Sequence, residues 1–132
     1  MRVLLDTNAY TALMRGAPGV ADRVRRSERV LLSVVVLGEL HYGFQRGSRL
    51  RENLAQLEQF LDSPFIEVLP VGRDTAERFG RIAAGLRSRG TPIPTNDIWI
   101  AAQAMETGAH LVSFDRHFGS VEGLLWVEPE PV

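Results

Sequence analysis

The chain contains no cysteine and no lysine, and each absence excludes a class of chemistry. Without cysteine there is no disulfide and no thiolate metal site. All 15 basic residues are arginines, so mechanisms that need a lysine ammonium, such as P-loop nucleotide hydrolysis or Schiff-base catalysis, are excluded. No apolar run approaches the roughly 18 residues of a membrane span, and the N-terminus lacks the pattern of a signal peptide. We therefore expect a cytoplasmic protein that does not enter a membrane.

The length and composition are typical of a folded globular protein. The 132 residues are 45% hydrophobic and 23% charged. A chain of this length predicts a single domain spanning residues 1–132. The formal net charge of -1 provides no global attraction to nucleic acid, so any such binding must come from local patches.

The hydrophobic pattern predicts strands that alternate with helices. Short apolar runs indicate strands at residues 3–5, 30–32, 66–69, 111–113 and 125–127. Apolar spacings of three and four residues indicate helices at residues 9–15, 18–26, 34–43, 48–61, 74–89 and 98–107. Asp74 with Glu77 is read as a capping box, Gly43 as a helix end, and residues 128–131 as a loose tail. This order predicts an α/β fold with a central, largely parallel sheet of four to five strands flanked by helices.

Asp6 ends the first apolar strand and is followed by two small polar residues, Thr7 and Asn8. Ligands of open α/β sheets bind just beyond the carboxyl ends of the strands, which makes Asp6 a candidate site residue. Asp also caps helices, so Asp6 could serve only as the N-cap of the next helix. Asp115 ends a later apolar strand in the same way. The two strands could therefore direct acids to one edge of the sheet.

Two further acids lie close to predicted helix starts. Glu39 lies in an otherwise apolar helix, where a buried carboxylate needs a partner or a cation, although a solvated helix face would also accommodate it. Asp97 follows a loop with two prolines, and the helix dipole would also favour it there as a mere cap. If these two acids converge with Asp6 and Asp115, their repulsion must be compensated by protons or cations. Clustered carboxylate oxygens select Mg²⁺ or Mn²⁺.

The three histidines lie in different segments of the chain, which argues against a zinc site. We interpret His41 and His110 as surface residues. His117 lies two residues after Asp115 and is read as a solvated loop residue, with a contact to substrate as the alternative.

Four segments of the chain resemble the PIN-domain ribonucleases and, within them, the VapC-type toxins of bacterial toxin-antitoxin pairs. They are Leu4-Leu5-Asp6-Thr7-Asn8, residues 33–43, residues 92–102, and Ser113-Phe114-Asp115-Arg116-His117-Phe118 with Gly123-Leu124. Each segment alone is weakly specific. The four in this order are highly specific and extend over nearly the whole chain.

This resemblance implies a fold, an activity and a site. The family has the PIN-like α/β fold and cleaves RNA with Mg²⁺ or Mn²⁺. The resemblance implies that the catalytic, metal-binding acids are Asp6, Glu39, Asp97 and Asp115. Asn8 and Ser113 would be neighbouring polar supports, while Thr7, Thr95 and Asn96 are read as backbone caps. Arg116, next to Asp115, is a candidate contact for the RNA backbone.

The resemblance also implies partners. A small VapB-type antitoxin would neutralise the enzyme, and two copies of the chain would form a homodimer. The helices at residues 48–61 and 74–89 favour a dimer as well, because they carry more apolar residues than a thin sheet needs. One departure concerns the metal: many relatives have an acid two residues after the position of Asp115, where this chain has His117. Whether one or two ions bind therefore stays open.

Two alternatives belong to other functional classes. The first is an aspartyl-phosphate phosphatase, because an apolar strand ending in a nucleophilic Asp is similar to residues 3–6. That family needs a phosphate-binding lysine, which this chain lacks, and an acid where this chain has Asn8. The second is a catalytically silent PIN-like binding module, against which the four intact acids argue.

Overall fold

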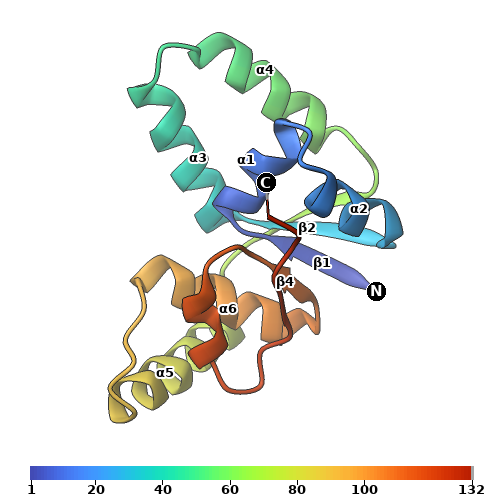
Figure 1. Ribbon diagram of the computed structural model, residues 1–132. Helices are drawn as coiled ribbons and strands as arrows, with labels where there is room; N and C mark the ends of the chain where they lie inside the picture. The colour runs from blue at the N-terminus through green and yellow to red at the C-terminus, as the bar shows by residue number, and fades with distance from the viewer. Residues whose placement is uncertain (132) are drawn as a thin grey trace.

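The computed structural model describes residues 1–131, in which helices and strands alternate along the chain (Figure 1). The elements are β1 (Arg2–Leu5), α1 (Thr7–Met14), α2 (Pro18–Arg26), β2 (Arg29–Ser33), α3 (Val34–Arg46), α4 (Leu50–Leu61), β3 (Ile66–Leu69), α5 (Arg73–Ser88), α6 (Thr95–Thr107), β4 (His110–Val112), a 3-10 helix (Arg116–Ser120) and β5 (Trp126–Val127). Among these described residues, no helix is both long and apolar enough to cross a bilayer.

The strands form one sheet in the order β3-β2-β1-β4-β5, with parallel pairing in each of the four described strand pairs. The predicted largely parallel sheet is thus confirmed. From β1 the chain proceeds to β2 and β3 on one side, and it later adds β4 and β5 on the other side of β1. The direction of strand addition therefore reverses beside β1. In open α/β sheets, the crevice at the carboxyl ends of strands beside such a reversal is where ligands bind.

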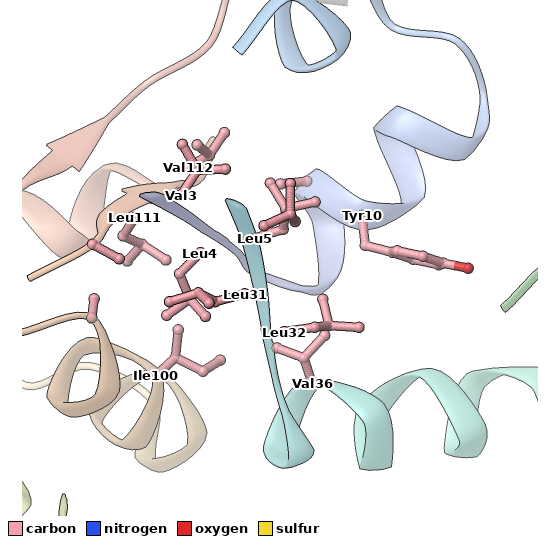
Figure 2. Packing of buried hydrophobic residues seen from close by; sticks show 14 of the residues in the cluster. Val3, Leu4, Leu5, Tyr10, Leu31, Leu32, Val36, Ile100, Leu111 and Val112 are labelled. Carbon is pink, nitrogen blue, oxygen red and sulfur yellow. The ribbon is translucent and has the colours of Figure 1, made fainter. Parts of the chain in front are cut away.

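Both faces of the sheet are covered at β1, β2 and β4, which explains why these strands carry continuous apolar runs rather than alternating ones. Val3, Leu4 and Leu5 are completely buried. Figure 2 shows Leu4 directed toward Ile100 of α6, whereas Leu5 points to the opposite face, where α1 lies. In Figure 1, α5 and α6 lie on the opposite side of the sheet from α1 and α2.

Helix ends agree with the sequence where a side chain or a left-handed glycine sets them. The Ser33 hydroxyl accepts a hydrogen bond from the Val35 N–H at 3.0 Å and so caps the start of α3. Gly16, Gly90 and Gly108 follow α1, α5 and α6 with positive φ angles, as expected of helix-terminating glycines.

Three local predictions are wrong. Helix α3 continues through Gly43 to Arg46, because Gly43 does not adopt a positive φ and the helix keeps packing through Phe44. Helix α5 begins after Gly72, whose N–H donates to the buried Thr75 hydroxyl at 3.1 Å, so Asp74 and Glu77 do not form a capping box.

The third concerns the C-terminal tail, which is packed rather than loose. Pro129 is buried, and the Glu130 backbone lies so close to Gly19 that a Cβ there would stand 2.8 Å from the Glu130 nitrogen. The tail therefore closes over the start of α2.

Candidate active site

A cavity of about 460 Å³ lies at the carboxyl ends of β1, β2 and β4 and holds all four acids predicted from the sequence. Its lining residues are Asp6, Thr7, Asn8, Glu39, Pro94, Thr95, Asn96, Asp97 and Asp115. Asp6 directly follows β1, and Asp115 lies three residues beyond the end of β4. Glu39 comes from α3, which follows β2, and Asp97 lies in the first turn of α6.

Asp6 serves both as a helix cap and as a wall of the cavity, so the two readings of this residue are compatible. Its Oδ1 accepts a hydrogen bond from the Ala9 N–H at 2.9 Å, which caps α1. Its Oδ2 accepts a hydrogen bond from the Ser113 hydroxyl. Burial raises the pKa of Asp6 from 3.8 to about 6, the two hydrogen bonds oppose that rise, and the nearby Asp115 and Asp97 charges add to it.

Ser113 connects two of the acids. While its hydroxyl donates to Asp6, the same oxygen accepts a hydrogen bond from the Asp115 N–H at 3.0 Å. Ser113 is completely buried, so no water competes for this hydroxyl. The distance between the ends of β1 and β4 is thereby fixed at the site.

Glu39 is held by residues from two other elements. Thr7 at the start of α1 donates its hydroxyl to Glu39 Oε1 at 2.6 Å. Asn96 at the start of α6 donates its side-chain amide to Glu39 Oε2 at 3.4 Å. These contacts exclude the reading of Glu39 as a residue on a freely solvated helix face.

Asp97 contacts a histidine rather than the backbone of its own helix. No side-chain capping bond is formed at the start of α6, whereas Asp97 Oδ2 lies 2.8 Å from His117 Nε2. Burial raises the pKa of Asp97, the adjacent His117 opposes this effect, and the Glu39 and Asp115 charges reinforce it. The alternative that Asp97 is only a cap is therefore not supported by its geometry.

A model of the PIN domain family matches residues 3–124. The chain belongs to the PIN domain family. Ribonuclease VapC5 of Mycobacterium tuberculosis is 31% identical over 95% of this chain and 91% of its own length. The tRNA(fMet)-specific endonuclease VapC of Shigella flexneri is 32% identical over 94% and 95% of the two chains.

Among the solved structures, this chain is similar to a chain of VapBC-1 from nontypeable Haemophilus influenzae. That chain superimposes with a TM-score of 0.86 at 27% identity and covers 97% of this chain and 98% of its own. The PIN-like fold expected from the sequence is thus confirmed.

The remaining sequence-predicted residues of this PIN domain lie in different places. Asn8 lines the cavity and is exposed. Arg116 is not among the cavity-lining residues, and its guanidinium donates a hydrogen bond to Glu128 at 3.2 Å. Its contact with RNA stays a prediction.

Three residues near the acids were read differently from the sequence. Thr7 and Asn96 were interpreted as backbone caps, yet their side chains hold Glu39. His117 was interpreted as a solvated loop residue, yet the 3-10 helix turns its imidazole toward Asp97. The only available signal was proximity along the chain to the acids, because the contacts themselves depend on how the elements meet.

The acids of the cavity, together with His117 beside Asp97, fit a divalent cation. The donors are carboxylate oxygens with one imidazole nitrogen, and a carboxylate atom from each of Asp97 and Asp115 lies with a His117 nitrogen within a group spanning at most 4.8 Å. Asp6 and Glu39 line the same cavity outside that compact group. Burial raises the pKa of Asp6 and of Asp97, neighbouring acid charges add to this rise, and a bound cation would oppose it.

Proposed function

We propose that this PIN-domain protein is a divalent-metal-dependent endoribonuclease toxin of the VapC type, neutralised by a cognate VapB-type antitoxin. The observation that carries this proposal is the convergence of Asp6, Glu39, Asp97 and Asp115 on one cavity. The full-length relatives support the RNA substrate, because one is named a ribonuclease and another a tRNA(fMet)-specific endonuclease.

Mg²⁺ or Mn²⁺ would be held by Asp6, Glu39, Asp97 and Asp115. When bound, the ion supplies the activation of water for phosphodiester hydrolysis and offsets charge on the attacked phosphate. The protein contributes a preorganised set of ligands. Ser113 orients Asp6, while Thr7 and Asn96 orient Glu39, so the carboxylates need little rearrangement to bind a cation.

The electrostatics of the cavity explain why activity should depend on the cation. Four carboxylates repel an RNA phosphate, and the N-termini of α1 and α6 at the cavity only partly offset this repulsion. A bound divalent cation would offset two of these four charges and would offer the phosphate a direct electrostatic contact. Asn8 and Thr95 are both exposed at the cavity and would donate hydrogen bonds to the RNA backbone.

The proposed antitoxin would lay a segment over the acidic cavity, with an arginine reaching Asp6 or Asp97. A guanidinium fork suits a carboxylate cluster because it donates two parallel hydrogen bonds. The likeness to the VapBC-1 structure supports a partner of this kind. Expression of this protein alone should arrest growth, and co-expression of the adjacent upstream gene should restore it. Harmless expression of the active wild type would contradict the toxin role.

A homodimer remains part of the proposal, although one of its sequence arguments is weaker. Helix α4 exposes Leu54, whereas α5 contributes none of the large exposed hydrophobic side chains of the described residues. Phe65 and Val68 at the β3 edge are exposed instead. Light scattering at micromolar concentration tests the dimer, and a species of 14.7 kDa alone would exclude it.

The activity is tested by incubating the purified protein with total tRNA in Mn²⁺, in Mg²⁺ and in EDTA. We expect cleavage in a divalent ion, no cleavage in EDTA, and a loss of activity in Asp6→Asn and Asp97→Asn. His41→Asn, which changes an exposed residue of α3 outside the cavity lining, is the matched control and should cleave normally. If Asp6→Asn preparations cleave as fast as wild type, the activity belongs to a contaminant.

A further inference from the structure

His117 places a nitrogen atom among the carboxylates of the site. It lies in the 3-10 helix that follows Asp115. Its imidazole ring packs against the completely buried Phe118 ring, and the two ring centroids are 4.7 Å apart. This contact restrains the imidazole ring, although 32% of the His117 side chain remains exposed. The imidazole is therefore held in position by the fold.

The His117 Nε2 atom itself is buried and has no aligned hydrogen-bond partner among the described residues. It lies 2.8 Å from Asp97 Oδ2, yet this close contact does not have hydrogen-bond geometry. A buried polar atom without a partner normally costs free energy, so its retention beside two carboxylates needs a reason. The compact group of Asp97, Asp115 and His117 supplies one, since all three atoms could bind the same ion.

The kind of donor determines which ion such a group prefers. Carboxylates and water suit Mg²⁺, which retains its water shell and favours oxygen ligands. An imidazole nitrogen shifts the preference toward first-row transition-metal ions. A site with two carboxylates and an imidazole should therefore discriminate between Mn²⁺ and Mg²⁺ more strongly than one made of acids alone.

We propose that His117 is a direct metal ligand, through Nε2, and that it makes the site select transition-metal ions such as Mn²⁺ over Mg²⁺. This inference rests on the proposed metal-dependent function and goes beyond it by assigning a nitrogen ligand and an ion preference. Neutral imidazole would coordinate through the Nε2 lone pair, with the proton carried on Nδ1. Asp97 and Asp115 would complete the compact part of the ligand set.

The direct test is pulsed electron paramagnetic resonance of the wild-type protein loaded with Mn²⁺ alone. Coordination by His117 predicts a modulation from a ¹⁴N nucleus bound to the Mn²⁺. This modulation should persist in His41→Asn and disappear in His117→Asn. The control is matched because both changes replace a histidine with the same residue, and His41 lies outside the cavity lining.

Ion competition provides a second readout that does not depend on activity. We expect His117→Asn to weaken Mn²⁺ binding by about tenfold or more, with a much smaller change for Mg²⁺. His117→Asp, which restores an oxygen donor, should reduce the ratio of Mn²⁺ to Mg²⁺ affinity relative to wild type. Circular dichroism of both variants should match wild type, because His117 is not part of the hydrophobic core.

The possible results separate this inference from the proposed function. If Mn²⁺ binds to wild type without a ¹⁴N modulation, His117 only positions Asp97 and the inference is overturned, while the metal site stands. If wild type binds no Mn²⁺ at all, both the inference and the proposed metal-dependent function fail. A modulation that survives in His117→Asn would assign the nitrogen to another residue and overturn the inference as well.

Discussion

The Ser113 hydroxyl donates a hydrogen bond to the Asp6 carboxylate and so joins the ends of β1 and β4 across 107 positions of sequence. The same oxygen accepts the Asp115 N–H at 3.0 Å. Ser113 is completely buried, so its hydroxyl links the Asp6 side chain to the Asp115 backbone without competition from water.

Ser113→Ala should therefore reduce both stability and activity. The substitution leaves the Asp115 N–H and the buried Asp6 Oδ2 without their partners, which costs about 1–3 kcal/mol in the free energy of unfolding. It should also raise the pKa of Asp6 further, since the Ser113 hydrogen bond holds it down. Urea denaturation measures the first effect.

Ser88→Ala is the matched control, because the Ser88 hydroxyl is exposed and bonds only the Gly85 carbonyl of its own helix. It should change stability by less than about 0.5 kcal/mol. Equal losses in the two variants would show that the bridge between Asp6 and Asp115 contributes nothing specific.

Asp6→Asn should stabilise the metal-free protein at neutral pH. The folded-state pKa of Asp6 is raised to about 6 from 3.8, so the folded state binds this proton more tightly than the unfolded chain does. This contribution to stability is fully present below pH 3.8 and is lost as the pH rises through 6. Above both pKa values, ionisation of Asp6 lowers the free energy of unfolding of wild type by about 3 kcal/mol. The gain in Asp6→Asn should be smaller than this, because the amide makes poorer hydrogen bonds than the carboxylate.

Thermal unfolding in EDTA at pH 4 and pH 8 measures this difference. We expect Asp6→Asn to melt above wild type at pH 8 and close to it at pH 4. An advantage that is the same at both pH values would not come from the ionisation of Asp6.

Thr7→Val should weaken metal binding without unfolding the protein. The two side chains have nearly the same shape, but valine cannot donate the 2.6 Å hydrogen bond that orients Glu39. Loss of such a supporting contact lowers metal affinity by about 10–100-fold. Titration with Mn²⁺ measures the effect.

Thr11→Val, in the same helix, removes a hydroxyl that bonds only the Thr7 carbonyl, so its Mn²⁺ affinity should equal that of wild type. An unaltered affinity in Thr7→Val would show that Glu39 needs no support from α1.

The positions of the four acids could be predicted because parallel strands present their carboxyl ends at one edge of the sheet. Asp6 and Asp115 follow strands, Asp97 lies in the first turn of α6, and Glu39 lies on α3, the helix that directly follows β2. The side-chain contacts of Glu39 and Asp97 could not be predicted from the sequence. Thr7, Asn96 and His117 reach these acids only through the packing of α1, α3, α6 and the 3-10 helix, which periodicity does not encode.

The helix ends also include some that local sequence predicts and some that depend on contacts with other elements. Gly108 ends α6 through a local left-handed conformation that glycine favours, so the sequence was sufficient there. The start of α5 differs from the sequence prediction because Thr75 is completely buried and donates to Glu106 at 2.6 Å. The contact between Thr75 of α5 and Glu106 of α6 thus determines the cap of α5, whereas the local sequence favours Asp74.

Gly19→Ala should destabilise the protein through the C-terminal tail, although alanine favours helices. The new Cβ would stand 2.8 Å from the Glu130 nitrogen, so the tail must move and uncover the buried Pro129. Overpacking of this kind costs about 1–3 kcal/mol.

Gly80→Ala, at an exposed position of α5 where a Cβ meets nothing within 4 Å, is the control and should stabilise by about 0.5–1 kcal/mol. In a chain that lacks residues 128–132, Gly19→Ala should stabilise the protein instead of destabilising it. Gly80→Ala should stabilise both chains. If Gly19→Ala also stabilises the intact chain, the tail contributes no packing.

Asp97→Asn should relieve repulsion in the metal-free site while abolishing tight metal binding. Two unit charges about 5 Å apart at an effective dielectric near 20 repel by about 3 kcal/mol, before salt and proton uptake reduce this. Asparagine keeps the size of the side chain and a polar contact for His117, so the change is mainly one of charge. We expect a net gain of about 1 kcal/mol in EDTA at neutral pH.

The pH and the metal response identify the cause of that gain. The pKa of Asp97 is raised in the folded state, so its ionisation destabilises the fold at neutral pH but not below its ordinary pKa. The advantage of Asp97→Asn in EDTA should therefore shrink at pH 4. Added Mn²⁺ should raise the melting temperature of wild type far more than that of the variant, since only wild type keeps every proposed ligand. A variant that melts below wild type in EDTA and responds equally to Mn²⁺ would make Asp97 a structural residue outside the metal site.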